Sequence, residues 1–165
     1  MAIAEYLDKT YPETPQVIPH NTAALQTAFV DGFRNNFSAA LDFITPAASS
    51  KLNPRSEEYY RRTREKWLGN KMEEMAPKGE AAIAQWARFR DGLGKVDAWY
   101  AKNGGGGPFL LGEAPSWGDI VVASYLVCLR IVWGEDSPEW KDISSWHNGR
   151  WAGLVGALKK YETVV

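Results

Sequence analysis

The sequence predicts an all-α protein, a helical bundle preceded by a short helix and a proline-rich linker. Apolar residues recur every three or four positions in several segments, which is the period of a helix face. Clusters of proline, glycine and serine separate these segments. No segment alternates between apolar and polar residues as a β-strand would, and no internal repeat is found.

The first residues are expected to form a helix remnant and a linker. Apolar side chains share one face of a helix over 2–10, but no capping residue precedes it, so we expect a chain shortened at its start. Segment 11–19 contains three prolines, which restrain the backbone and remove hydrogen-bond donors. Residues 1–19 are thus a predicted remnant and linker, and residues 20–165 a helical domain.

The helical domain is predicted to begin with an aromatic helix, capped by Asn21 or Thr22 and ending before Pro46. Its apolar stripe consists of Leu25, Phe29, Phe33, Phe37, Leu41 and Ile44. Residues 46–54 are rich in proline and serine and are expected to form a loop. The next helix is predicted to begin with Ser56 as its cap and acidic residues in its first turn. Its inner face is expected to contain Tyr60, Trp67, Met72 and Met75.

Three further helices are predicted. One follows Pro77, and its apolar stripe consists of Ile83, Trp86, Phe89, Leu93, Val96 and Tyr100. It ends at the glycines of segment 103–108, which lacks the strand and lysine typical of a phosphate-binding loop. The second extends from Ser116 to about Trp133. Residues 134–145 are expected to be a loop with at most one short helix. The last helix is amphipathic, with an apolar face made of Trp151, Leu154, Val155, Leu158 and Tyr161.

The stretch FLLGEAPSWGDIVVASYL, residues 109–126, contains a carefully specified helix start. The Ser116 hydroxyl can accept a hydrogen bond from the backbone N–H of residue 119, and the Asp119 carboxylate can accept one from Ser116. The helix that follows is apolar nearly all round, so we expect it in the middle of the domain. Unpaired donors at a buried helix end are costly, which makes this predicted N-cap of Ser116 and Asp119 a folding device.

Composition and charge argue against several classes of protein. The 19 basic and 20 acidic residues nearly cancel, so neither nucleic acid nor a membrane surface is an expected partner. The apolar stretch 120–129 is too short to span a bilayer, and the N-terminus lacks a signal-peptide pattern, so a cytoplasmic protein is expected. His20 and His147 are far apart in the sequence, so no metal site is expected. Cys128 lies in the apolar run and is expected to be buried and inert.

Three segments resemble parts of glutathione S-transferases. Residues 109–126 resemble the segment that opens the central helix of that family's C-terminal domain. IAEYLDKTYPETPQVIP resembles the junction between the family's thioredoxin-like N-terminal half and its helical half, and YYRRTREKWLGNKMEEM resembles a segment of the fungal and β-etherase-like transferases. The resemblance implies a glutathione-transferase C-terminal-type helical bundle that lacks most of the thioredoxin-like domain.

The resemblance also implies where function lies. The family holds glutathione and activates its thiol with the N-terminal half, so no residue here is assigned a catalytic role and no cofactor is expected in this chain. The helical half contributes most of the pocket for hydrophobic substrates. The matching residues in this chain are Phe33, Phe37, Tyr60, Arg64 and Trp133. Core packing is the alternative for the aromatic side chains, and a solvated or ion-paired face is the alternative for Arg64.

Three functions remain open. In the first, the chain is a truncated glutathione S-transferase-like protein that cannot activate glutathione alone and binds hydrophobic or aromatic small molecules. In the second, it is a fragment of an active transferase or β-etherase-like enzyme. In the third, it is a non-enzymatic protein-interaction module. A missing N-terminal half would expose apolar surface, which favours a homodimer or ligand binding. Resemblance at the level of the fold does not separate these hypotheses.

Overall fold

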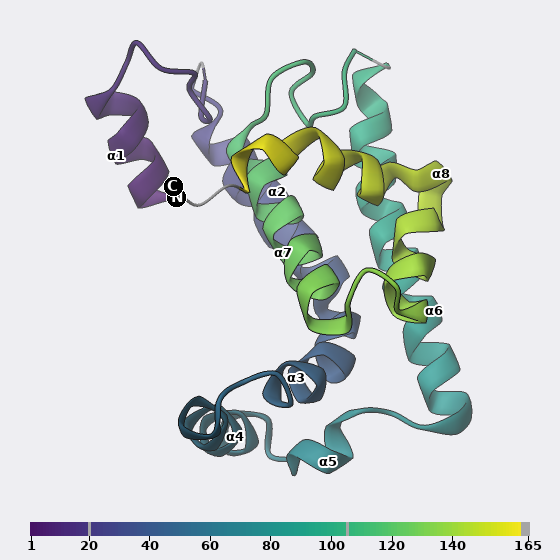
Figure 1. The fold of residues 1–165 in the computed structure, drawn as a ribbon. Coiled ribbons are helices and arrows are strands. Elements are labelled where there is room, and N and C mark those ends of the chain that lie inside the picture. Colours follow the sequence, from purple (N-terminus) through teal and green to yellow (C-terminus); the bar gives the residue numbers. More distant parts are fainter. Residues whose placement is uncertain (20, 105, 163–165) are drawn as a thin grey trace.

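The computed structural model describes residues 1–19, 21–104 and 106–162, which fold into an all-α bundle as the sequence predicts (Figure 1). Its α-helices are α1 (Ala2–Thr10), α2 (Ala23–Phe37), α3 (Leu41–Ser49), α4 (Pro54–Leu68), α5 (Met72–Met75), α6 (Gly79–Tyr100), α7 (Trp117–Trp133) and α8 (Pro138–Leu158). Short 3-10 turns follow α2, α6 and α8. Within the described part of the chain, no helix has the length and apolar character needed to cross a membrane.

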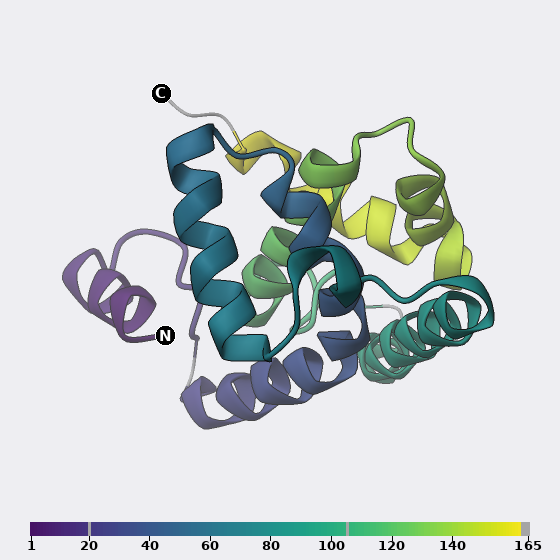
Figure 2. The same cartoon turned by 90° about the horizontal axis from the view of Figure 1, so that it is seen from below.

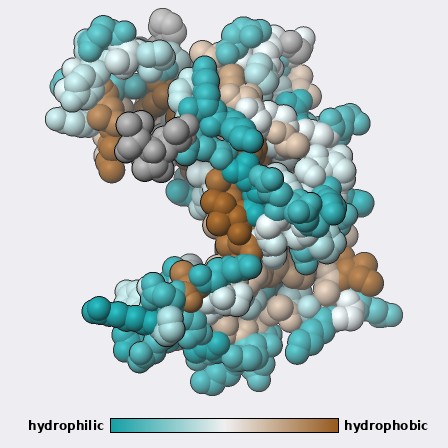
Figure 3. Space-filling view, in the orientation of Figure 1, coloured by the Kyte–Doolittle hydropathy of each residue, from teal (hydrophilic) through white to brown (hydrophobic). Residues whose placement is uncertain are grey.

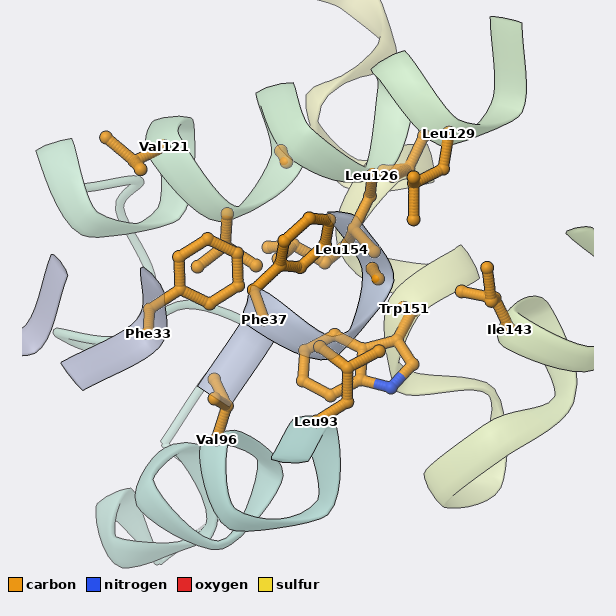
Figure 4. Close-up of a cluster of buried hydrophobic side chains, with 14 of the residues drawn as sticks. Phe33, Phe37, Leu93, Val96, Val121, Leu126, Leu129, Ile143, Trp151 and Leu154 are labelled. Carbon is orange, nitrogen blue, oxygen red and sulfur yellow. The ribbon is translucent and has the colours of Figure 1, made fainter. Parts of the chain in front are cut away.

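The core of the bundle lies where α7 packs against α2 and α8, with α6 closing the other side (Figure 1). The side chains of Phe33, Leu93, Leu126, Ile143 and Trp151 are essentially inaccessible to solvent and come from four different helices. Figure 4 shows these side chains converging between the helices. Helices α3, α4 and α5 lie at one end of this core, and α1 lies at an edge of the molecule (Figures 1 and 2).

The start of α7 contains the predicted capping box. Both Ser116 and Asp119 are buried. The Asp119 carboxylate accepts hydrogen bonds from the Ser116 N–H at 2.8 Å, the Leu110 N–H at 2.8 Å and the Tyr100 hydroxyl at 2.9 Å. Burial, and next to it the Asp119 charge, raise the pKa of the Tyr100 phenol far above its usual range. The carboxylate therefore joins the end of α6, the 106–116 loop and α7 at one buried point.

The linker is fixed to the same end of α7. The Gln26 amide, which is buried, donates to the Val17 carbonyl at 3.1 Å and accepts from the Gly118 N–H at 2.9 Å. On the other side of the linker, the Asp8 carboxylate accepts from the N–H groups of Val17 and Ile18. These bonds tie α1, through Asp8, to α2 and to the start of α7.

The predicted end of the aromatic helix before Pro46 is wrong. The helix expected to end before Pro46 consists of α2, a 3-10 turn over Ser38–Ala40 and α3, and Pro46 lies inside α3. The helix continues to Ser49, although a loop was expected there. Proline removes one backbone donor, but Ser49 is buried at only 2% exposure, and this packing outweighs the lost bond. Thr22 precedes α2, yet its hydroxyl donates to the Pro19 carbonyl instead of capping the helix.

The start and inner face of α4 also differ from the prediction. The cap is Asn53, whose side chain accepts from the Ser56 N–H at 3.0 Å, so Ser56 lies inside the helix. Trp67 is 75% exposed and does not belong to the inner face. Met72 lies in α5, because Gly69 adopts a left-handed conformation with φ 77° and ends α4.

Helix α8 begins inside segment 134–145, which was expected to be a loop with at most one short helix. Ser137 caps it by accepting from the Trp140 N–H at 3.1 Å, and Pro138 occupies its first position, a combination typical of a helix start. The helix is interrupted at residues 146–149, where the backbone leaves the helical conformation. Of the sequence predictions, His20 and part of the glycine segment 103–108 fall outside the described residues.

Candidate functional site

One face of α7 remains exposed although the helix is central. Ile120, Ser124, Cys128 and Ile131 follow at spacings of four, four and three, and all four are exposed. The expected central position holds for the opposite face, where Leu126 is fully buried. Figure 3 shows apolar surface on the floor of a hollow, at the place where Figure 1 shows α7 between α1 and α4.

A cavity of about 520 Å³ opens between the linker, the first half of α7 and the end of α8. Its lining is mostly aliphatic and includes Val17 from the linker, Pro115 and Ile120 from the start of α7, and Leu158 from α8. In the part of the chain that the structure describes, Glu162 is the single charged residue of this lining. The volume and apolar lining are those of a site for a small hydrophobic molecule.

A second cavity, of about 290 Å³, lies farther along α7, against the end of α2 and α3. Its lining is uncharged and consists of Phe37, Leu41, Ile44, Ser124, Tyr125, Cys128 and Leu129. The rings of Phe37 and Tyr125 lie 4.9 Å apart at 80°, an edge-to-face arrangement. Because Ser124 lines both cavities, they meet on the exposed face of α7. We call this continuous surface the α7 groove.

Cys128 is exposed, so the prediction of a buried thiol is wrong. The apolar run places it on α7, but its position along the helix puts it on the face that the bundle leaves uncovered. Partial desolvation by its surroundings raises the pKa of the thiol. The thiol is therefore mainly protonated at neutral pH and is a weaker nucleophile than a free cysteine.

The predicted ligand-binding residues Phe33 and Phe37 have different positions. Phe37 lines the second cavity, although it is only 2% exposed. Phe33 is fully buried, with its ring 5.4 Å from Phe37 and 5.3 Å from Tyr125. Phe33 thus supports the two rings that face the cavity and has no open side of its own.

Tyr60 and Arg64 lie on α4, a helix that buries none of its residues. The Arg64 guanidinium lies over the Tyr60 ring at 4.8 Å and near the Trp67 ring at 5.9 Å, which are cation–π distances. Among the arginines of this helix, Arg61 forms ion pairs instead, with several glutamates that include Glu57 at 2.9 Å. Tyr60 and Arg64 are not among the residues that line the α7 groove.

Trp133 belongs to a different part of the molecule. It lies at the end of α7, with its ring 5.8 Å from Trp86. Trp86 in turn contacts Phe89 at 5.6 Å, and Phe89 contacts Phe37 at 5.3 Å. Two rings therefore separate Trp133 from the nearest predicted residue that lines the groove.

Ser124 and Tyr125 line the groove but were not predicted from the sequence. Their signal is the spacing of small and polar side chains in an apolar helix: Ser124 and Cys128 interrupt the run one turn apart. Such an interruption indicates the face of a buried helix that the rest of the fold leaves open. The linker residues that line the first cavity carry no such signal, because their position depends on bonds from Asp8 and Gln26.

Comparisons with known proteins agree with this all-α architecture. A family model described as "Glutathione S-transferase, C-terminal domain" matches residues 24–161, and the chain belongs to the glutathione S-transferase family. The glutathione S-transferase-like protein ustS of Aspergillus flavus is 31% identical over 167 residues, which cover 93% of this chain and 56% of ustS.

Two crystal structures show how close the fold is. CsGST63524 of Ceriporiopsis subvermispora, solved in complex with glutathione, is 42% identical with a TM-score of 0.93, covering 99% of this chain and 66% of that protein. GSTFuA3 of Phanerochaete chrysosporium is 36% identical with a TM-score of 0.90, covering 99% and 64%. The chain thus spans less than two thirds of the length of ustS, and just under two thirds of each of these structures.

Proposed function

We propose that this chain binds neutral hydrophobic or aromatic small molecules in the α7 groove. The observation that carries the proposal is the meeting of two apolar cavities at Ser124, on a helix face with exposed isoleucines. Exposed apolar surface of this kind is typical of an interaction site. At about 25 cal/mol per Å² of buried apolar area, less the cost of immobilising the ligand, an open groove supports affinities in the micromolar range.

The second cavity favours a flat aromatic ring. Phe37 and Tyr125 present aromatic edges and faces there, and Leu41 and Ile44 close the sides with aliphatic groups. An aromatic ligand gains edge-to-face contacts with these rings beyond the burial of its area. A charged group would lose its hydration in this uncharged lining without gaining an ion pair.

We also infer that these 165 residues do not bind or activate glutathione by themselves. Glutathione carries carboxylates, and among the described residues the one charged side chain that lines the α7 groove is the acidic Glu162. Activating a thiol requires a hydrogen-bond donor or a positive charge beside the sulfur. CsGST63524 binds glutathione, and it is longer than this chain. As a second candidate, therefore, the chain contributes the hydrophobic pocket to a longer glutathione transferase.

Fluorescence of a neutral phenolic or naphthalene dye tests ligand binding, with two matched variants. Ser124→Arg places a charge where the cavities meet, at an exposed position that tolerates it. Ile131→Arg places the same charge on the same helix, at a residue that is 69% exposed and lines neither cavity. We expect Ser124→Arg to weaken dye binding at least about tenfold and Ile131→Arg to leave it nearly unchanged. Equal affinities in both variants would show that the dye binds elsewhere.

Titration calorimetry at millimolar glutathione tests the second inference. We expect no saturable heat from the 165-residue chain. One-to-one binding would overturn the inference without affecting the dye result, because the two ligands differ in charge. The two candidates are then separated by repeating both titrations after joining this chain to the part of CsGST63524 that it does not cover, because the longer-enzyme hypothesis requires glutathione binding by such a protein.

A further inference from the structure

Helix α8 changes direction at an unusual bend. Trp146 leaves the helical conformation with ψ 149°, and His147, Asn148 and Gly149 then have φ values of 52°, 59° and 76°. Glycine adopts such left-handed backbone freely, whereas other residues incur a steric cost. Two non-glycine residues in this conformation must therefore be held there by contacts with their surroundings.

The His147 side chain makes the main polar contact at the bend. Its Nδ1 accepts a hydrogen bond from the indole Nε1–H of Trp151 at 2.8 Å. Trp151 is fully buried and lies in the centre of the core (Figure 4). On α6, Gly94 leaves room for the imidazole, since a Cβ at this position would lie 3.0 Å from Nε2 of His147. The bend thus supplies a hydrogen-bond acceptor to an indole that cannot reach water.

This bond requires a neutral imidazole. In the neutral ring Nδ1 can accept while Nε2 carries the proton, but in the imidazolium ion both nitrogens donate. A proton on Nδ1 would face the Trp151 N–H, and two donors would then meet at the edge of the core. A buried donor without an acceptor is strongly disfavoured, so protonation and the closed bend exclude each other.

The charges around the imidazole come from two helices. Arg90, Asp91 and Asp97 face it from α6, and Arg150 from α8. Asp97 is paired with Arg150, so much of its field at the ring is cancelled. Desolvation is the largest influence and lowers the pKa of His147; Asp97 and Asp91 act in the opposite direction, and the arginines add to the lowering.

We propose that the bend of α8 is a proton-sensitive hinge, in which protonation of His147 breaks the bond from Trp151 and releases residues 150–158 from the core. The pKa of His147 is lower in the closed state than in an open one, so the closed state binds fewer protons. Its stability is therefore complete above the ordinary histidine pKa of about 6.5 and falls as the pH decreases below that value. Val155 and Leu158, which line the α7 groove, lie on the released segment.

Amide hydrogen exchange of residues 150–158 between pH 7.5 and pH 5, corrected for the intrinsic exchange rate, tests the hinge. We expect the opening equilibrium to rise by up to about tenfold per pH unit below pH 6.5. His147→Asn should abolish this rise, because asparagine tolerates left-handed backbone and its amide oxygen can take the place of Nδ1 without titrating. The chain has two histidines, and His20→Asn is the matched control that should keep the rise. A flat profile in the unmodified protein, or the same rise in His147→Asn, would overturn the proposal.

A nuclear magnetic resonance titration of the unmodified chain covers the case in which His147→Asn does not fold. The proposal requires the His147 ring to carry its proton on Nε2 at pH 7.5 and to titrate below 6.5. The Trp151 indole N–H resonance must shift along the same curve. A His147 pKa at or above 6.5 would contradict the hinge. So would a Trp151 indole resonance that does not shift as His147 titrates. Neither measurement involves a dye or glutathione, so the result does not depend on the proposed function.

Discussion

Replacing Asp119 by alanine removes the acceptor at the start of α7. The carboxylate is fully buried and accepts hydrogen bonds from two backbone N–H groups, those of Ser116 and Leu110, and from the hydroxyl groups of Tyr100 and Ser116. In the variant these donors lose their partner in a place with little access to water. The hydroxyls can rotate toward other acceptors, whereas the two N–H groups are fixed by the backbone.

The expected loss follows from these fixed donors. A buried donor left unpaired costs about 1–3 kcal/mol, so the two N–H groups together cost about 2–6 kcal/mol. An ordinary exposed N-cap contributes only about 0.5–2 kcal/mol. We therefore expect Asp119→Ala to lower the free energy of unfolding by about 3–5 kcal/mol, which is a large part of the total of about 5–15 kcal/mol for a typical domain.

Urea unfolding followed by circular dichroism measures this loss, and two variants calibrate it. Tyr100→Phe deletes one donor and leaves the carboxylate with its other bonds, so we expect a loss of about 1–2 kcal/mol. Asp119→Asn keeps the shape, but its amide group must face one of the two pairs of donors, and its loss should lie between the other two. A loss below about 1 kcal/mol for Asp119→Ala would refute the reasoning, because it would mean that these donors find other acceptors.

Two further predictions use glycine positions and the exposed thiol. Gly92→Ala should destabilise the chain by about 1–3 kcal/mol, because its Cβ would lie 2.1 Å from the backbone oxygen of Asn36 on α2. Gly153→Ala, with nothing within 4 Å of its Cβ, should instead stabilise α8 by about 0.5–1 kcal/mol. If the two alanine variants shifted the melting temperature in the same direction, both expectations could not hold. Cys128 should react with a disulfide reagent in the native chain, more slowly than free cysteine because burial raises its pKa. A thiol that reacts only after unfolding would show that the α7 groove is closed.

The sequence predicted the helices well because periodicity reports directly on which face is apolar. Phe89 and Leu93, two members of one predicted stripe, are fully buried. Periodicity does not report how far a neighbouring element extends, and this explains the exceptions. Ile83 continues the same stripe, yet it is 73% exposed because the bundle ends before it. Trp67 has helical spacing relative to Tyr60, but Gly69 ends α4 before another element covers it.

The candidate site was predicted less well, because a groove depends on what the fold leaves uncovered. Phe37 was found because it belongs to the Phe-rich stripe that faces α7. Trp133 was placed in the pocket because the family resemblance puts the pocket at the end of the central helix, but its ring contacts Trp86 instead. The polar interruption at Ser124 indicates an open helix face, but not that two cavities meet over this residue.

Helix α7 is fixed by hydrogen bonds at its start and is exposed along one face. Substitutions at the start should therefore affect stability, and substitutions on the exposed face should affect ligand binding. Asp119 and Gln26 fix the start of α7 from the side that faces the core, whereas Ser124 lies on the opposite, uncovered face. Asp119→Ala should therefore lower stability and leave dye affinity nearly unchanged in the molecules that remain folded. Ser124→Arg should do the reverse. Affinity measured well below the melting temperature of each variant decides the matter: if Asp119→Ala loses affinity as strongly as Ser124→Arg, the groove depends on the position of the whole helix and not on its exposed face.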